Sequence, residues 1–271
     1  MSIIDIHTHL HPPRLFRAIR RWFAEHSDWN LSHPTEPEAV ARSLRDFGVE
    51  RFVFCSYAHK AGMAREINQW LSETSRKLDR YGLPLATVHV DDPDAAQYYE
   101  EALNDGCVGL KIHEDVQKFA IDDARLEPIH ALTAKSAGFV LVHVGPIPWQ
   151  DDTANGPARV GAVLEKHPGL TVVVAHMGVP ETDKYLELTR EHPNLYLDTT
   201  MAFTHRLTMR CQATSETFDA YQHNIVFGSD HPNLPHHYSQ EVEEAAARCS
   251  SQEIKRMVFS ENARQLLSGH L

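Results

Sequence analysis

The sequence predicts a single-domain (β/α)8 TIM barrel covering residues 1–271. Eight short apolar runs alternate along the chain with segments of helical period, and several runs end in a histidine or an aspartate. A doubly wound open sheet would also alternate strands and helices. However, no Gly-rich phosphate loop follows any run, and the polar ends of runs one, five, six and eight could converge only at the mouth of a closed barrel.

The apolar runs are expected to be parallel strands, because they are nearly continuous in Val, Ile, Leu and Phe. A strand with one face in water would instead alternate apolar and polar residues. The predicted strands cover residues 3–6, 51–55, 85–90, 107–112, 139–144, 171–175, 195–198 and 225–227.

The segments between the runs have the apolar spacing of helices. Thr35 and Glu38 are spaced as a capping box at the start of the first, and Asp92-Pro93 opens another that ends near Gly106. The predicted helices lie at 35–47, 67–78, 92–106 and 160–166. No linker, repeat or low-complexity tract interrupts the alternation, so we expect one domain.

The composition excludes several classes of protein. A net charge of −11 argues against a nucleic-acid surface, and the four cysteines form neither a CxxC pair nor a disulfide framework. No apolar stretch approaches the roughly 20 residues that span a membrane, and strand-like sequence from Ile3 leaves no room for a signal peptide. We therefore expect a soluble cytoplasmic protein without a nucleic-acid or membrane partner.

The first strand ends in a His-x-His pair. His7 and His9 stand two residues apart, and alternate side chains of a strand share a face, so both imidazoles can reach one point. Imidazole suits Zn²⁺, Mn²⁺, Fe²⁺ or Ni²⁺, and a catalytic ion commonly has about three protein ligands and one open position. The pair predicts a metal site, although an isolated His-x-His is a weak signal.

Three further strand ends add polar groups to this pair. His143 ends FVLVH, His176 ends VVVAH, and Asp230 follows VFGS. Each has an alternative structural role, the histidines as buried side chains bonded to a carbonyl and Asp230 as an N-cap. Five coincidences of residue type and position favour one shared divalent ion, with zinc as the first choice.

Six motifs along the chain resemble a known superfamily. IDIHTHL, GLKIH, LVHVG, VVVAHMG, NLYLDTT and VFGSD, in this order, resemble the amidohydrolase superfamily, and within it the amidohydrolase-2 branch that includes aminocarboxymuconate-semialdehyde decarboxylase-like enzymes. The resemblance covers nearly the whole chain. It implies a TIM barrel in which His7, His9, His143 and Asp230 bind one metal ion. It also implies that His176 is a catalytic base or polarising group beside that ion.

Lys111 in GLKIH leaves the number of ions open. Many binuclear amidohydrolases carry a carboxylated lysine at the end of the fourth strand, where it bridges two metals. We favour the alternative that Lys111 neutralises carboxylates or holds a substrate anion, because the branch that this chain resembles usually has one metal ion. His113 is expected on the same face as Lys111, and with a second ion His176 would become one of its ligands.

These residues predict a metal-dependent hydrolase that acts on a small amide, ester or lactone through an activated water molecule. Asp230 or His176 would remove a proton from the water and later protonate the leaving atom. Non-oxidative decarboxylation or hydration of a small carboxylic acid is the alternative, since the branch contains both chemistries. A barrel that binds metal or ligand without catalysis is disfavoured by the complete ligand set.

Two insertions are expected to be loops that shape the pocket, one at 10–35 after the first strand and one at 146–157 after the fifth. Their aromatic residues predict either an apolar pocket wall or packing on the barrel rim or at a subunit contact. These residues are Trp22, Phe23, Trp29 and Trp149. The same residues favour a homodimer.

Overall fold

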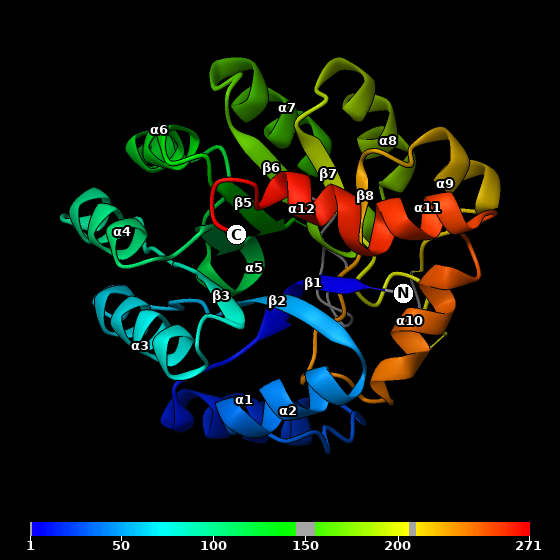
Figure 1. The fold of residues 1–271 in the computed structure, drawn as a ribbon. Coiled ribbons are helices and arrows are strands. Elements are labelled where there is room, and N and C mark those ends of the chain that lie inside the picture. The colour runs from blue at the N-terminus through cyan, green and yellow to red at the C-terminus, as the bar shows by residue number, and fades with distance from the viewer. Residues whose placement is uncertain (1, 145–154, 206–209) are drawn as a thin grey trace.

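Eight parallel strands form a closed barrel in the computed structural model, which describes residues 2–144, 155–205 and 210–271 (Figure 1). Strands β1 to β3 are hydrogen-bonded in one ladder and β4 to β8 in another. The ladders join where Ala86 pairs with Leu110, and between β8 and β1, where Ile6 N donates to Phe227 O at 3.0 Å. The strands are β1 (Ile3–His9), β2 (Val49–Cys55), β3 (Gly82–Leu85), β4 (Gly109–His113), β5 (Phe139–His143), β6 (Thr171–Val174), β7 (Leu195–Asp198) and β8 (Ile225–Val226). The predicted TIM barrel is confirmed.

Helices cover the outside of the barrel, and every connection between consecutive strands contains at least one (Figure 1). They are α1 (Pro13–His26), α2 (Pro37–Asp46), α3 (Ala64–Lys77), α4 (Ala95–Asn104), α5 (Glu114–Gln117), α6 (Glu127–Lys135), α7 (Gly156–Lys166), α8 (Thr182–Glu191), α9 (Ser215–Ala220), α10 (Tyr238–Ala246), α11 (Gln252–Arg256) and α12 (Asn262–Leu266). The four predicted helices correspond to α2, α3, α4 and α7. Within the described ranges, no helix has the length and apolar character needed to cross a membrane.

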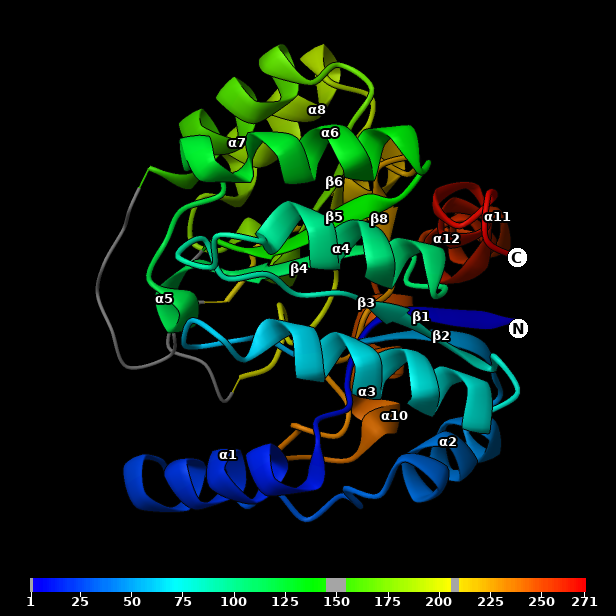
Figure 2. The same ribbon diagram turned by 90° about the vertical axis from the view of Figure 1, so that its left-hand side faces the viewer.

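Apolar side chains fill one end of the barrel. Figure 2 shows α11 and α12 at the end where β1 begins, close to both chain termini. Ala263, Leu266 and Leu267 pack there against inward-facing strand residues. This layer includes Ile4, Ile6, Val53, Leu83, Leu85, Phe139, Leu141, Val173 and Val226. The polar strand ends lie at the opposite end, where TIM barrels carry their active sites.

The alternation of side chains along each strand produces two cores. In β5, Phe139 and Leu141 point into the barrel, whereas Val140 and Val142 join the larger core between the strands and the helices. All four side chains are fully buried. Burial on both faces explains why the sequence of each strand is continuously apolar.

A bulge in β1 aims its histidines into the barrel. Between Asp5 and Thr8, three steps along β1 match two steps along β2. The extra residue reverses the alternation of side chains. Ile6 before the bulge lies in the barrel interior, and His9 after it contacts Cys55, which belongs to the same interior. A strict period of two would have turned His9 outward.

The predicted third strand, 85–90, is wrong in position, because β3 spans Gly82–Leu85. After the bridge residue Ala86, the backbone of Thr87 bonds to a side chain instead of a neighbouring strand. Thr87 N donates to Asn68 Oδ1 at 2.8 Å, and Asn68 Nδ2 donates to Thr87 O at 2.9 Å. This amide from α3 takes both backbone hydrogen bonds of Thr87, so the buried segment that follows is not a strand.

Three predictions near helix starts are also wrong. Residues 10–35 contain the 14-residue helix α1 rather than only a loop. The predicted capping box does not form, since α2 begins at Pro37 without a side-chain cap. Pro37 marks the start of α2 in place of a cap, because the fixed φ angle of proline suits the first position of a helix. Helix α4 begins at Ala95 rather than at Asp92-Pro93.

Candidate metal centre

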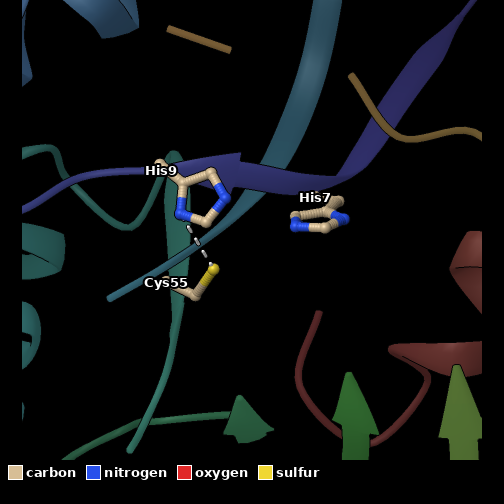
Figure 3. Close-up of side chains that lie close together, drawn as sticks. All are labelled: His7, His9 and Cys55. Atoms are coloured by element: carbon tan, nitrogen blue, oxygen red, sulfur yellow. Dashed lines mark hydrogen bonds between the residues drawn. The ribbon is translucent and has the colours of Figure 1, made fainter. Parts of the chain in front are cut away.

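The His-x-His pair of β1 and the aspartate after β8 meet at the barrel mouth. His9 Nε2 lies 2.9 Å from Asp230 Oδ1, and His7 Nε2 lies 3.5 Å from the same oxygen. Both histidines are buried. Figure 3 shows their rings next to one another along β1. The structure therefore brings together three residues that lie near opposite ends of the sequence.

The predicted residues of β5 and β6 form a second pair. His143 Nδ1 and His176 Nε2 are 2.9 Å apart. His176 Nδ1 lies 2.9 Å from the carbonyl oxygen of Thr200. A carbonyl only accepts hydrogen bonds, so His176 Nδ1 carries the hydrogen, and in the neutral ring Nε2 presents a lone pair toward His143.

Lys111, on β4, contacts the first pair, and the two pairs approach each other at His7 and His176. Lys111 Nζ lies 3.1 Å from His7 Nε2, and the ring centroids of His7 and His176 are 5.5 Å apart. The lysine side chain is almost completely buried, with a relative exposure of 1%. A buried ammonium group is costly unless it has polar partners, which favours a role at this centre. The centre comprises His7, His9, Lys111, His143, His176 and Asp230.

Asp198, the last residue of β7, has no role in the sequence prediction. Its Oδ2 accepts a hydrogen bond from His7 Nδ1 at 2.8 Å, and its Oδ1 accepts from the backbone N–H of His176 at 2.9 Å. Burial opposes its charge, but His7 and the hydrogen bonds hold its pKa below the ordinary value. Asp198 thereby orients His7 with Nε2 toward the centre. Its place at a strand end, like that of Asp230, is the signal that identifies it.

Cys55, the last residue of β2, is the second residue that the sequence prediction leaves without a role. Its Sγ lies 3.5 Å from His9 Nδ1, the contact drawn as a dashed line in Figure 3. The β1–β2 ladder pairs His9 with Cys55 directly. Potential ligand atoms of His7, His9 and Cys55 all lie within 4.8 Å of one another. Cys55 belongs to no CxxC pair, so the pattern of cysteines in the sequence does not identify it as a thiol that contacts a histidine.

His113 lies in an outer layer of rings above the centre. It stacks on His143 with a centroid distance of 4.1 Å, and the ring of Tyr57 meets it edge-on at 5.4 Å. Tyr57 also contacts His11 at 5.6 Å. His11 Nε2 and His113 Nδ1 are both buried without a hydrogen-bond partner in the described part of the chain. Burial and the charge of Lys111 lower the pKa of His113 well below its ordinary value, so the ring is neutral at pH 7.

Two residues of the centre have a left-handed backbone. The φ angles are 57° at His176 and 74° at Asp230. Such a conformation costs a non-glycine residue of order 1–3 kcal/mol, and it is typical of functional sites. Backbone hydrogen bonds hold both residues, since His176 N donates to Asp198 Oδ1 and Asp230 N donates to His7 O at 2.8 Å.

The charges and lone pairs fit a cation. Because a carboxylate only accepts, His7 donates its Nδ1 hydrogen to Asp198 and its Nε2 lone pair faces Asp230. Burial alone would lower the pKa of His9, but Cys55 and Asp230 outweigh it and raise the pKa to about 10, so without an ion His9 is protonated and its Nε2 donates to Asp230 Oδ1. An ion bound at Nε2 would take the place of this proton. Despite burial, His9 and His7 hold the pKa of Asp230 well below its usual range. A carboxylate surrounded by imidazole nitrogens is a donor set that binds divalent transition ions.

The predicted aromatic wall is only partly described, because Trp149 lies outside the described residues. Phe23 and Trp29 stack at 5.6 Å between centroids, and Trp22 stacks on His26 at 4.7 Å. Trp29 also packs against the main core. These contacts are compatible with a pocket wall and with packing on the barrel rim, so both alternatives stay predictions. The homodimer stays a prediction.

Comparisons with known proteins give the family and the fold of the chain. The family model described as Amidohydrolase matches residues 4–268. An uncharacterized TIM-barrel protein from Bordetella bronchiseptica has a TM-score of 0.78 and 19% identity, covering 100% of this chain and 99% of that chain. A probable 2-pyrone-4,6-dicarboxylic acid hydrolase from Acinetobacter baumannii, solved with citric acid bound, has a TM-score of 0.69 and 13% identity, covering 99% and 100%. Comparison with curated proteins found no significant match.

A decarboxylase shares the same fold. The 5-carboxyvanillate decarboxylase from Novosphingobium aromaticivorans, complexed with manganese and 4-hydroxy-3-methoxy-5-nitrobenzoic acid, has a TM-score of 0.69 and 13% identity, covering 98% of this chain and 96% of that chain. Similarity at this level of identity shows the fold alone. The family match, which spans nearly all residues, shows more: the chain belongs to the amidohydrolase family and is an enzyme of the metal-dependent amidohydrolase superfamily.

Proposed function

We propose that this enzyme hydrolyses a small amide, ester or lactone at one divalent ion, with zinc as the first choice and manganese, iron or nickel as alternatives. His7, His9, His143 and Asp230 would hold the ion. The main support is the close approach of His9 Nε2 and Asp230 Oδ1, two largely buried groups 2.9 Å apart. A divalent ion at such a site lowers the pKa of water from 15.7 to about 7 and polarises a carbonyl group.

Asp230 and His176 would transfer the protons. Asp230 is ionised because its pKa is held well below the usual range, so its carboxylate can accept a proton from the attacking water. His176 offers the Nε2 lone pair, since its Nδ1 donates to Thr200 O at 2.9 Å. Either group can later return the proton to the leaving atom. General acid–base catalysis of this kind contributes roughly 10²–10⁴-fold in rate.

Lys111 would hold a substrate anion beside the ion. Its Nζ is buried and has His7 Nε2 as its hydrogen-bond partner at 3.1 Å. The alternative is a carboxylated Lys111 that bridges two ions. In that case His176 would become a ligand to the second ion through its Nε2 lone pair, since its Nδ1 donates to Thr200 O. Elemental analysis of the purified protein decides between about one and about two equivalents of metal.

The outer ring layer would bind the uncharged part of the substrate. His11 Nε2 and His113 Nδ1 are buried without partners in the described part of the chain, and the ring of the half-buried Tyr57 contacts both histidines. Buried polar atoms are normally paired, so the two nitrogens favour a ligand with hydrogen-bonding oxygen atoms. A planar substrate would also fit against the imidazole and phenol rings.

Decarboxylation of a small aromatic or unsaturated acid is the second candidate. The position of Lys111 favours it, because a cation next to the centre can hold a carboxylate. The shared fold of the 5-carboxyvanillate decarboxylase is consistent with it. The ligand residues are equally suited to both reactions, so the products must distinguish them.

A substrate panel tests both proposals. Amides, esters, lactones and aromatic acids are incubated with protein loaded with Zn²⁺ or Mn²⁺, and acid release and CO₂ release are measured separately. Hydrolysis predicts acid release without CO₂, whereas decarboxylation predicts stoichiometric CO₂. Chelator-treated protein is the control. Turnover that persists at full rate after the metal has been removed would refute both proposals.

A further inference from the structure

We propose that Cys55 is a positioning residue that orients the ligand His9, an inference that rests on the proposed function. The thiol occupies the last position of β2, directly opposite His9 in the ladder. Its Sγ lies 3.5 Å from His9 Nδ1 and 3.4 Å from the carbonyl oxygen of Thr8. Cys55 has no exposed surface, so bulk water does not reach the sulfur.

The two histidines of β1 have equivalent supports from different strands. Asp198 of β7 accepts from His7 Nδ1 at 2.8 Å, while Cys55 of β2 lies against His9 Nδ1 (Figure 3). In both cases the Nδ1 atom is held and Nε2 faces Asp230. Such partners fix the tautomer and the orientation of a metal-binding imidazole. The support for His9 differs in being a thiol rather than a carboxylate.

The hydrogen bonds around the sulfur form a directed chain. The thiol S–H donates to Thr8 O, and the sulfur accepts the hydrogen of His9 Nδ1. His9 Nε2 lies 2.9 Å from Asp230 Oδ1, which only accepts, so Nε2 donates to this carboxylate and would give up its hydrogen to bind an ion beside Asp230. Without the sulfur, Nδ1 would be a buried donor with no partner, and the ring could rotate or change tautomer.

The geometry favours a supporting role over direct ligation. Sulfur contacts Nδ1, whereas Asp230 contacts Nε2 on the other side of the ring. An ion bound by Nε2 and Asp230 therefore lies on the side of His9 that faces away from this contact. For Cys55 to bind that same ion, its sulfur would have to move from the Nδ1 side of His9 to the Nε2 side.

Metal affinity measured without substrate tests the inference. Metal-free wild type, Cys55→Ala and Cys55→Ser compete with a chromophoric chelator for Zn²⁺. We expect Cys55→Ala to bind about 10- to 100-fold more weakly, as is typical when the partner of a ligand histidine is removed. Cys55→Ser should stay within a few-fold of wild type, because its hydroxyl can still accept from Nδ1.

Cys107→Ser is the matched control. Cys107 is also buried, and its Sγ lies 3.6 Å from Ser72 Oγ, outside the centre. Circular dichroism verifies that each variant is folded. Should Cys55→Ala fail to fold, Co²⁺ spectra of wild type and Cys55→Ser still decide the question. A supporting thiol gives no sulfur-to-cobalt charge-transfer band, whereas a ligating thiol gives a band that is lost in Cys55→Ser.

The outcomes separate the two proposals. Equal Zn²⁺ affinity of wild type and folded Cys55→Ala would overturn the role of Cys55 and leave the proposed function intact. A charge-transfer band that requires Cys55 would make it a ligand and also overturn the inference. A wild-type protein that takes up no divalent ion would refute the proposed function and, with it, this inference.

Discussion

The two ends of the barrel share the same strands but differ in chemistry. Along β5, Leu141 belongs to the apolar interior, and two residues later His143 lies 2.9 Å from His176. Along β2, Val53 packs in the same interior, and two residues later Cys55 contacts His9. On both strands, a residue of the apolar interior is therefore followed two positions later by a residue that contacts a histidine of the centre. Substitutions at the two ends should have separable effects on stability and on turnover.

The largest effect is expected at the mouth, from Asp230→Asn. The variant loses the charge that faces His7 and His9, so turnover should fall by roughly 10²–10⁴-fold or more. Steady-state kinetics measures the loss, and urea denaturation verifies that the barrel remains folded. Asp46→Asn, an exposed change on α2, is the control. Full activity of Asp230→Asn would contradict both its ligand and its proton-transfer roles.

The apolar end should show the opposite result. Leu141→Ala removes a fully buried side chain from the barrel interior, and such changes typically lower the free energy of unfolding by about 2–5 kcal/mol. Urea denaturation measures this loss, and chelator competition measures metal affinity. We expect affinity to stay near the wild-type value. A large loss of affinity without a loss of stability would show that the two ends are not separable.

Away from the mouth, a buried histidine on α6 should make the stability of the barrel sensitive to acid. His130 on α6 donates from Nε2 to Ile121 O at 2.9 Å, and burial lowers its pKa from 6.5 to about 4. The unfolded chain therefore binds a proton between pH 6.5 and 4 that the folded chain does not, so stability falls as the pH drops through this range. The cost from His130 alone reaches about 3 kcal/mol at pH 4.

His130→Gln isolates this contribution, because its side-chain amide can keep the bond to Ile121 O without titrating. The free energy of unfolding, measured by urea denaturation from pH 7 to pH 4, should depend less on pH in this variant. The same pH dependence in wild type and His130→Gln would show that other buried histidines account for the acid sensitivity.

The smallest effect is expected in the outer ring layer. Tyr57→Phe removes one hydroxyl proposed to face the substrate, and loss of one hydrogen bond corresponds to about a 2- to 12-fold increase in KM. Tyr196→Phe makes the same chemical change in the apolar interior and serves as the control. Kinetics with the best substrate of the panel measures both. An equal effect of the two variants would argue against a substrate role for Tyr57.

The sequence was most informative where residue type and strand position agreed. His7, His9, His143 and Asp230 stand at or just beyond strand ends, and the parallel barrel brings all such ends to one mouth. The fold itself follows from runs that are apolar on both faces. The metal-binding roles of the four residues stay predictions until metal content and affinity are measured.

Contacts between distant side chains could not be predicted. Cys55 and Asp198 also stand at strand ends, but only the barrel geometry shows which histidine each one meets. The displaced β3 depends on the Asn68 amide, which binds the Thr87 backbone from a helix. The β1 bulge likewise depends on pairing with β2, and no local sequence pattern predicts the extra residue in β1.

The contact between His9 and Asp230 joins residues 221 positions apart. A ribosome adds about 5–20 residues per second, so roughly 10–40 seconds of synthesis separate these two side chains. During that interval the first strand has no eighth strand beside it, and His9 lacks the Asp230 carboxylate. The complete set of proposed metal ligands therefore comes together only late in synthesis, and an ion held by all four would mark a closed barrel.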